Sequence, residues 1–160
     1  MKIENILDVE NIFVNDTLTS KEEVIDRLTE SLVVSKVVLD KEKFIESIYD
    51  RESRASTYVG EYLVIPHGTC KHIAKPAIAI AKVDREFSWG EVYETVKLVI
   101  LFAIPEDGQW EEELEILKRF ASSLGDSKFI KELLEADTEG ELFQSVCKYL
   151  REKWERYNEN

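Results

Sequence analysis

The chain has 160 residues, of which 44% are apolar and 34% are charged, so it can bury one hydrophobic core and is short for two domains. Its 33 acidic residues outnumber its 21 lysines and arginines and give a net charge of −12, spread along the whole sequence. This balance argues against nucleic acid and anionic membranes as partners, because both select clustered basic side chains. We therefore expect a single domain over residues 1–160 that binds neither.

Membrane insertion and secretion are not expected either. The longest apolar run, Leu98–Pro105, has eight residues, which is too short to cross a bilayer. The first residues, MKIENILDVEN, are charged and unlike a signal peptide. The two cysteines, Cys70 and Cys147, do not form a C-x-x-C pair. These features favour a cytoplasmic protein with two free thiols.

The N-terminal third is predicted to be mainly helical. Ser20 and Glu23 form a capping box ahead of an apolar periodicity that predicts a helix over about residues 20–35. Asp40 can cap a second helix with its own apolar stripe. The stretch RESRAST (51–57) that follows is polar and predicts a loop.

Strands are predicted in the middle of the chain. A strand over Tyr62–Ile65 should end at Pro66, because proline has no N–H for the sheet and biases its predecessor toward extended geometry. The stretch AIAIAKV (77–83) alternates isoleucine with alanine, and the small alanines leave room for a packed helix. KLVILFAI (97–104) is apolar on both faces, as in a central strand that is covered on both sides.

Helical periodicity returns after the strands. It predicts three more helices, at Trp110–Leu124, at Ser127–Ala136, and from the capping box of Thr138 and Glu141 to about Trp154. Helices thus precede and follow a group of strands that includes one buried on both faces. This order indicates the α/β class, with a mixed β-sheet sandwiched between α-helices in three layers.

Residues 64–72, VIPHGTCKH, contain both histidines of the chain. We expect His67 to stand at the edge of a strand and the start of a loop, where a neutral imidazole could attack phosphorus. Gly68 has no Cβ, so it would let another molecule approach and would leave its N–H open to an anion. A polar loop histidine without chemistry is the alternative on this local pattern.

Other kinds of site find less support in the sequence. A metal site built from His67, Cys70 and His72 lacks the usual paired spacing and a fourth ligand, so no metal is expected. The chain has no G-x-S-x-G, P-loop or G-x-G-x-x-G motif, so neither a serine hydrolase nor a nucleotide cofactor is indicated. Cys70 and His72 are predicted to be loop residues.

The stretch RESRASTYVGEYLVIPHGT (51–69) resembles the active-site region of enzyme IIA domains of the bacterial phosphoenolpyruvate-dependent sugar phosphotransferase system, mannitol/fructose class. The opening ILDVENIFVNDTLTSKEEVIDRLTESLV resembles the family's N-terminal strand and first helix. KPAIAIAKV, KLVILFAIP and EELEILKRFASSLGDSKFIKELLEA resemble its later strands and helices in order and spacing. The resemblance covers nearly the whole chain and implies an enzyme IIA mannitol/fructose-like fold.

The resemblance also implies roles for individual residues. His67 would accept a phosphoryl group from the phosphocarrier protein HPr and pass it to an enzyme IIB component for sugar uptake, with no cofactor. Arg51 falls on the family's active-site arginine and would hold the phosphoryl oxygens. A surface ion pair with Glu52, or a charge at a helix end, is the alternative for Arg51. Thr57 and Gly68 would contribute a hydroxyl and a backbone donor.

One position departs from the family. Many members carry a second histidine in a segment H-L-x-I-L, whereas ELEIL (113–117) here places Glu113 at that point. A carboxylate could orient the imidazole of His67 but would repel a phosphate. Glu113 is then a residue of the rim with transfer intact, a solvated charge, or the mark of a regulatory module that signals to a regulator or an enzyme. The sequence indicates neither the sugar nor the oligomeric state.

Overall fold

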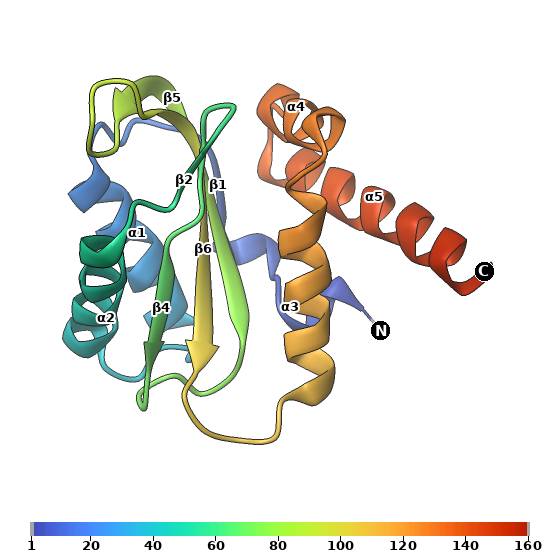
Figure 1. The fold of residues 1–160 in the computed structure, drawn as a ribbon, viewed down its shortest axis with the longest axis horizontal. Helices are drawn as coiled ribbons and strands as arrows, with labels where there is room; N and C mark the ends of the chain where they lie inside the picture. Colours follow the sequence, from blue (N-terminus) through green and yellow to red (C-terminus); the bar gives the residue numbers. More distant parts are fainter. Residues whose placement is uncertain (1, 160) are drawn as a thin grey trace.

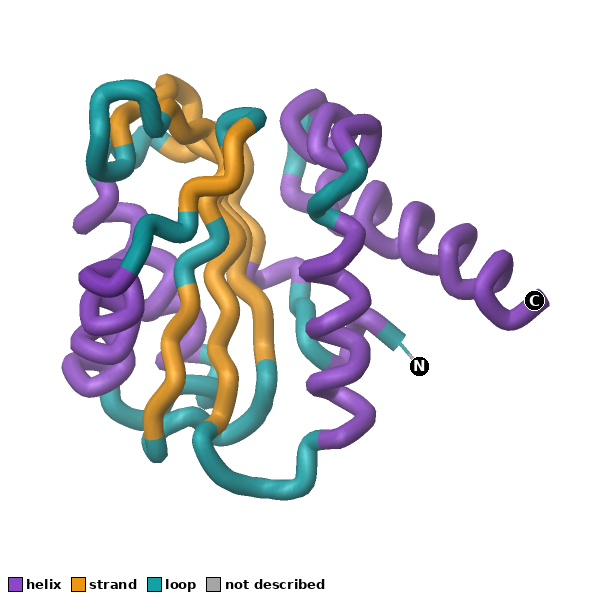
Figure 2. The backbone as a smooth tube through the Cα atoms, in the orientation of Figure 1, coloured by secondary structure: helices purple, strands orange, loops and turns teal. Residues whose placement is uncertain are grey.

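The computed structural model describes residues 2–159, and their side chains as far as Trp154. A six-stranded mixed sheet lies between two helical layers, as Figures 1 and 2 show, which confirms the predicted three-layer α/β fold. In the described part of the chain, none of the helices combines the length and the apolar character that crossing a membrane requires.

Two helices cover one face of the sheet and three cover the other (Figure 1). The first pair is α1 (Lys21–Val34) and α2 (Lys41–Arg54), and the second group is α3 (Glu111–Ser123), α4 (Ser127–Glu135) and α5 (Glu139–Glu159). Short 3-10 turns at Ile3–Asn5 and Val9–Asn11 precede the first strand. The strands are β1 (Ile12–Asp16), β2 (Tyr58–Gly60), β3 (Leu63–Val64), β4 (His67–Cys70), β5 (Ala77–Ser88) and β6 (Thr95–Pro105).

The helix starts follow from the capping residues. The Ser20 hydroxyl accepts a hydrogen bond from the backbone N–H of Glu23 at 3.2 Å, and the Thr138 hydroxyl accepts one from the N–H of Glu141 at 3.1 Å. These bonds satisfy amide groups that have no partner inside the helix. Both predicted capping boxes therefore mark real helix starts, and α5 runs on beyond its predicted end to Glu159.

Antiparallel strands β5 and β6 form the centre of the sheet, whose order is β1-β5-β6-β3-β2. Strand β1 pairs with β5 in parallel, and β3 pairs with the first half of β6 in parallel. Strand β4 pairs with the second half of β6, also in parallel, so it continues the line of β3. Because β4 pairs with no other described strand, it forms the edge of the sheet there.

The structure corrects the local prediction around Pro66. We expected the ladder to end there and a loop to begin at His67, but pairing resumes and His67 opens β4. Proline lacks a donor and keeps its carbonyl, which accepts the N–H of Phe102 at 2.9 Å. The loop predicted for RESRAST also starts later, because α2 continues to Arg54. Arg51 therefore lies in the last turn of a helix.

The central strands divide the core into two halves. Ile78 and Ile80 point toward α3, α4 and α5, while the alternating alanines of β5 pack against α1 and α2. Residues 98–103 of β6 are fully buried on both faces. The prediction that KLVILFAI is a central strand covered on both sides is therefore confirmed.

A row of aromatic rings crosses the half of the core under α3, α4 and α5. The ring of Phe102 on β6 lies 6.2 Å from that of Phe120 on α3, edge to face. Phe120 lies 6.3 Å from Phe129 on α4, and Phe129 stacks on Tyr149 of α5 at 4.1 Å. Such contacts fix the relative positions of the helices. The row ends at the edge of the sheet, beside His67.

Candidate phosphoryl-transfer site

His67 stands at the start of β4 with its ring on the α3 side of the sheet. Its register partner on β6 is Phe102, and the two ring centroids are 5.3 Å apart. The residue is half-buried, and its Nδ1 atom is buried without a hydrogen-bond partner among the described residues. Nε2 is therefore the ring nitrogen that remains accessible, and a ring packed on Phe102 presents it in one direction.

The surroundings of His67 favour its neutral form. Burial lowers the pKa of His67 below its ordinary value, and the positive charge of Arg51 lowers it further. The negative charge of Glu52 and the nearby carbonyl of Ile65 act in the opposite direction but do not reverse the shift. A neutral imidazole has a free lone pair, so the accessible nitrogen is a competent nucleophile near neutral pH.

Arg51 lies at the C-terminal end of α2, close enough for its charge to act on His67. Its Nη1 donates a hydrogen bond to the carbonyl of Ala55 at 2.7 Å, which satisfies one of the unpaired carbonyls at the helix end. No ion pair with Glu52 is present among the described side chains, so the alternative of a surface salt bridge finds no support. The guanidinium keeps further donors that an anion could use.

Glu52 and Thr57 form a buried pair beneath Arg51. The Thr57 side chain is buried, and its hydroxyl donates a hydrogen bond to Oε1 of Glu52. That hydrogen is therefore engaged within the protein, so the structure gives no support to direct donation from the Thr57 hydroxyl to a phosphoryl group. Oε2 of Glu52 accepts from Nε1 of Trp89 at 3.0 Å and lies 3.8 Å from Nζ of Lys21. We call Glu52, Thr57, Trp89 and Lys21 the Glu52 cluster.

Gly68 has a different role from the one we expected. A Cβ at this position would lie 2.3 Å from Cε2 of Phe44, a buried residue of α2. The ring of Phe44 fills the space that we expected to be free for another molecule, so that interpretation is wrong on this side of the residue. Glycine is needed here because it lets α2 pack directly on β4. Donation from its backbone N–H remains a prediction.

Glu113 lies in the first turn of α3 and is half-buried. It makes no hydrogen bond or ion pair with another described residue, and it is not among the groups that shift the pKa of His67. The charged residues that act on His67, Arg51 and Glu52, come from α2 on the other side of the edge strand. This arrangement favours a place on the rim of the site over contact with the imidazole.

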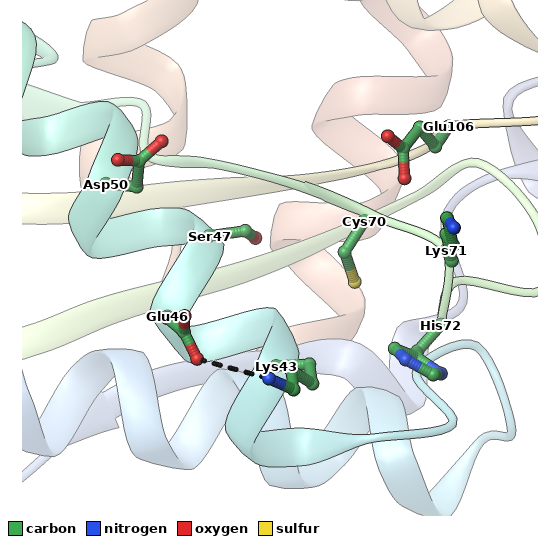
Figure 3. Close-up of a pocket in the computed structure, with 8 residues that line it drawn as sticks. All are labelled: Lys43, Glu46, Ser47, Asp50, Cys70, Lys71, His72 and Glu106. Carbon is green, nitrogen blue, oxygen red and sulfur yellow. Dashed lines mark ion pairs between the residues drawn. The ribbon is translucent and has the colours of Figure 1, made fainter.

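His72 and Cys70 belong to a different surface (Figure 3). They line an open hollow between α2 and the end of β4, where Lys43, Glu46 and Asp50 extend from the helix. The hollow does not include His67. Among the side chains that the structure describes, no group of three or more histidine, cysteine or acidic residues could hold a metal ion.

Sequence reasoning missed most of the Glu52 cluster. Lys21 packs its ammonium against the ring of Trp89, 5.1 Å from the centroid, while it pairs with Glu52. These residues come from α1, α2 and the β5–β6 turn, so no spacing in the sequence connects them. The adjacency of Glu52 to Arg51 was the only available signal, and it suggested an ion pair that does not form.

Comparisons with known proteins agree with the geometry. Residues 5–149 match the family described as phosphoenolpyruvate-dependent sugar phosphotransferase system, EIIA 2. The mannitol-specific phosphotransferase enzyme IIA component of Bacillus subtilis is 31% identical over 140 residues, covering 86% of this chain and 93% of that protein. The 2-O-alpha-mannosyl-D-glycerate-specific EIIABC component of Escherichia coli is 30% identical, and the match covers 91% of this chain but only 22% of that protein.

Solved structures give the same result. Mannitol IIA from Escherichia coli superposes with a TM-score of 0.69 at 26% identity, over 87% of this chain and 97% of that one. The same protein in complex with phosphorylated IIB gives a TM-score of 0.71 at 25% identity, over 88% and 98% of the chains. The nitrogen regulatory protein IIA of Neisseria meningitidis has a TM-score of 0.76 at 21% identity, over 90% and 98%, and that likeness shows the fold alone.

Proposed function

The chain belongs to the EIIA 2 family of the phosphoenolpyruvate-dependent sugar phosphotransferase system, and from this premise we propose that it carries a phosphoryl group on Nε2 of His67. The observation that carries the proposal is the state of the His67 ring. Nδ1 is buried, the pKa of the ring is lowered, and the ring packs on Phe102 at the edge of the sheet. One nucleophilic nitrogen is thus presented to an approaching protein.

The transfer step needs only these side chains. The lone pair of Nε2 attacks the phosphorus atom of a phosphorylated donor, a new N–P bond forms, and the bond to the donor breaks with its electron pair left on the donor. The reverse sequence passes the group from His67 to an acceptor. No cofactor or metal is required, because catalysis consists of positioning the two partners and stabilising charge.

Arg51 stabilises the phosphoryl oxygens in this proposal. Its charge acts on His67 from the end of α2, and only one of its donors is engaged by Ala55. A planar guanidinium can donate two parallel hydrogen bonds to a phosphoryl group. Arg51 therefore supplies the positive charge that the transferred group needs, and the backbone N–H of Gly68 is a second candidate donor. Glu113 is placed on the rim.

HPr as the donor and an enzyme IIB component as the acceptor fit this chemistry. A related IIA protein has been solved in complex with phosphorylated IIB. Val59 of β2 and Tyr62 of the turn that follows are exposed and apolar, and we propose them as a patch for transient contact with these partners. Both partners would meet the chain in the cytoplasm, which is the location we propose. The chain spans about a fifth of the length of the first curated relatives, 22% and 23%, so these partners are inferred from the site.

Phosphorylation in a reconstituted system tests the proposal. Phosphoenolpyruvate, enzyme I and HPr should give the wild-type protein an acid-labile phosphate. His67→Ala should acquire none, and His72→Ala, the matched control from the same segment, should be labelled as fast as wild type. An unlabelled wild type in the presence of fully phosphorylated HPr would contradict the proposal.

A regulatory module was the alternative from the sequence, and no observation favours it. The likeness to a nitrogen regulatory protein concerns the fold alone. Three curated relatives that match most of this chain are sugar-specific components. Transfer from the labelled protein to a purified IIB component would separate the two functions, because a purely regulatory module would retain its phosphate.

A further inference from the structure

The side chain of Glu52 is only 4% exposed, although it carries a carboxylate at the end of a surface helix. Three elements supply its partners: Lys21 from α1, Thr57 from the segment before β2, and Trp89 from the β5–β6 turn. Burying a carboxylate is costly unless donors surround it. Such a well-satisfied carboxylate, whose charge acts on His67, calls for a role.

Glu52 connects the two functional side chains to one short segment. Arg51 precedes it on α2, and the Arg51 guanidinium is bonded to the carbonyl of Ala55. On the far side of that segment, the Thr57 hydroxyl is bonded to Glu52 while the Thr57 carbonyl accepts the N–H of Ile65 at 3.0 Å. Ile65 lies two residues before His67. Residues 55–57 therefore link the helix end that carries Arg51 to the strand that carries His67, and Glu52 holds this segment through Thr57.

Trp89 extends this link to the turn between the central strands. Its indole N–H bonds Glu52, and its backbone N–H bonds the carbonyl of Glu94 at 2.9 Å. Glu94 is also buried. Burial opposes the ionisation of Glu94. Hydrogen bonds from Ser56 and from the backbone, together with the charge of Lys21, nevertheless keep the pKa of Glu94 below its ordinary value. A second carboxylate thus connects the same segment, at Ser56, to the turn between β5 and β6.

The charge of Glu52 also acts on His67. Arg51 and Glu52 on α2 are the charged groups that influence the imidazole, and their effects oppose each other. Glu113 on α3 is not among them, and Lys21 on α1 and Glu94 on the turn act on each other rather than on His67. A change at Glu52 should therefore be visible at His67 in two ways, as a change of position and as a change of protonation.

We propose that Glu52 is a positioning residue for phosphoryl transfer: through Thr57 and Trp89 it holds the end of α2 and residues 55–57 so that Arg51 and His67 keep the geometry the reaction needs. The inference rests on the proposed function of His67. It differs from a purely structural role, because removing Glu52 should alter the reactive side chains in a protein that is still folded.

Two variants of Glu52 separate its geometry from its charge. Glu52→Gln keeps the shape of the side chain, but an amide cannot accept the hydrogen bonds from both Thr57 and Trp89 as strongly as a carboxylate does. We therefore expect phosphorylation by phospho-HPr to slow about tenfold. The pKa of His67, followed by NMR in the unphosphorylated protein, should fall because a negative charge is lost. Glu52→Asp keeps the charge on a shorter side chain, so the His67 titration should resemble wild type while the rate falls.

Glu46→Gln is the matched control, since it removes an exposed carboxylate from the same helix, on the side of the hollow. It should leave both the rate and the His67 titration as in wild type. If Glu52→Gln proves too unstable by thermal unfolding, Trp89→Phe removes a single donor to Glu52 and should still slow transfer. A folded Glu52→Gln protein with wild-type rate and wild-type His67 titration would overturn the proposal. An unlabelled wild type would instead overturn the proposed function, while the NMR titration would still test the link to Glu52.

Discussion

His67 and His72 are five residues apart, yet the fold gives them opposite surroundings. His67 opens β4 with its ring on the α3 side, packed on Phe102 and within the influence of Arg51. His72 lies beyond the end of the same strand and lines an exposed hollow beside α2. The two imidazoles have the same intrinsic chemistry. What separates them is which face of the edge strand each one reaches and what lies on that face.

The position of a residue along β4 decides which face of the sheet its side chain reaches. Along a strand, successive side chains point to opposite faces, so His67 meets the aromatic core while Gly68 meets α2. One residue later, the same imidazole would have pointed at Phe44. The pairing of β4 with β6, which resumes after Pro66, therefore sets the face to which His67 points.

Substitution of Arg51 should have the largest effect on the rate at which His67 is phosphorylated. In Arg51→Lys the charge remains but the planar fork is lost, so phosphorylation should slow about 100-fold, or ~2.7 kcal/mol of transition-state stabilisation. The rate of labelling from phospho-HPr measures this. Arg54→Lys, three residues along on the exposed end of α2, is the control and should keep the wild-type rate. Equal rates in the two variants would remove Arg51 from the site.

The packing between α2 and β4 can be tested at Gly68. The added methyl group in Gly68→Ala would collide with the ring of Phe44, and overpacking of this kind should lower the free energy of unfolding by about 2 kcal/mol. Urea unfolding gives the number. Thr69→Ala changes the exposed neighbour and should cost less than about 1 kcal/mol. If Gly68→Ala is as stable as Thr69→Ala, the packing of α2 on β4 is looser than described.

The pH dependence of stability should report on the surroundings of His67. The pKa of His67 is lowered in the folded state below the value of 6.5 expected when unfolded, so folding favours the neutral ring. Its contribution to stability is fully present above pH 6.5 and is lost as the pH falls through the folded pKa. His67→Gln should therefore lose less stability than wild type on acidification, as measured by urea unfolding across this range. A slope in His67→Gln as steep as in wild type would argue against the lowered pKa.

The smallest effect is expected at Glu113. Because no described residue pairs with it and it does not influence His67, Glu113→His should leave the rate of phosphorylation close to wild type. A clear acceleration would mean that α3 reaches the phosphoryl group. In that case α3 would contribute a side chain to the site in addition to α2.

Much of the fold could be predicted from local patterns. Helix starts depend on side chains within three or four residues of the amides that they cap, and the faces of β5 alternate with its isoleucines and alanines. Tertiary pairing decided the rest. The continuation of β4 after Pro66 depends on the N–H of Phe102, which is contributed by a strand far away in the sequence.

The candidate site, too, could be predicted only in part from the sequence. His67 and Arg51 could be proposed from a motif and a family resemblance, and the fold places both where each can influence the other. Thr57 and Gly68 were given contacts with the phosphoryl group, whereas the structure binds one to Glu52 and packs the other against Phe44. Lys21 and Trp89 could not be found at all, because only the folded chain brings them to Glu52.

The aromatic row that runs from Tyr149 to Phe102 connects the ring of His67 to the hydrophobic core. Closely packed rings cannot shift independently, so a displacement of one ring is transmitted along the row. Repacking Phe120 or Phe129 should therefore disturb transfer without removing any charge from the site. Activity becomes a sensitive measure of order in a distant part of the protein, and a search for more stable variants should begin on the surface of α5 rather than along this row.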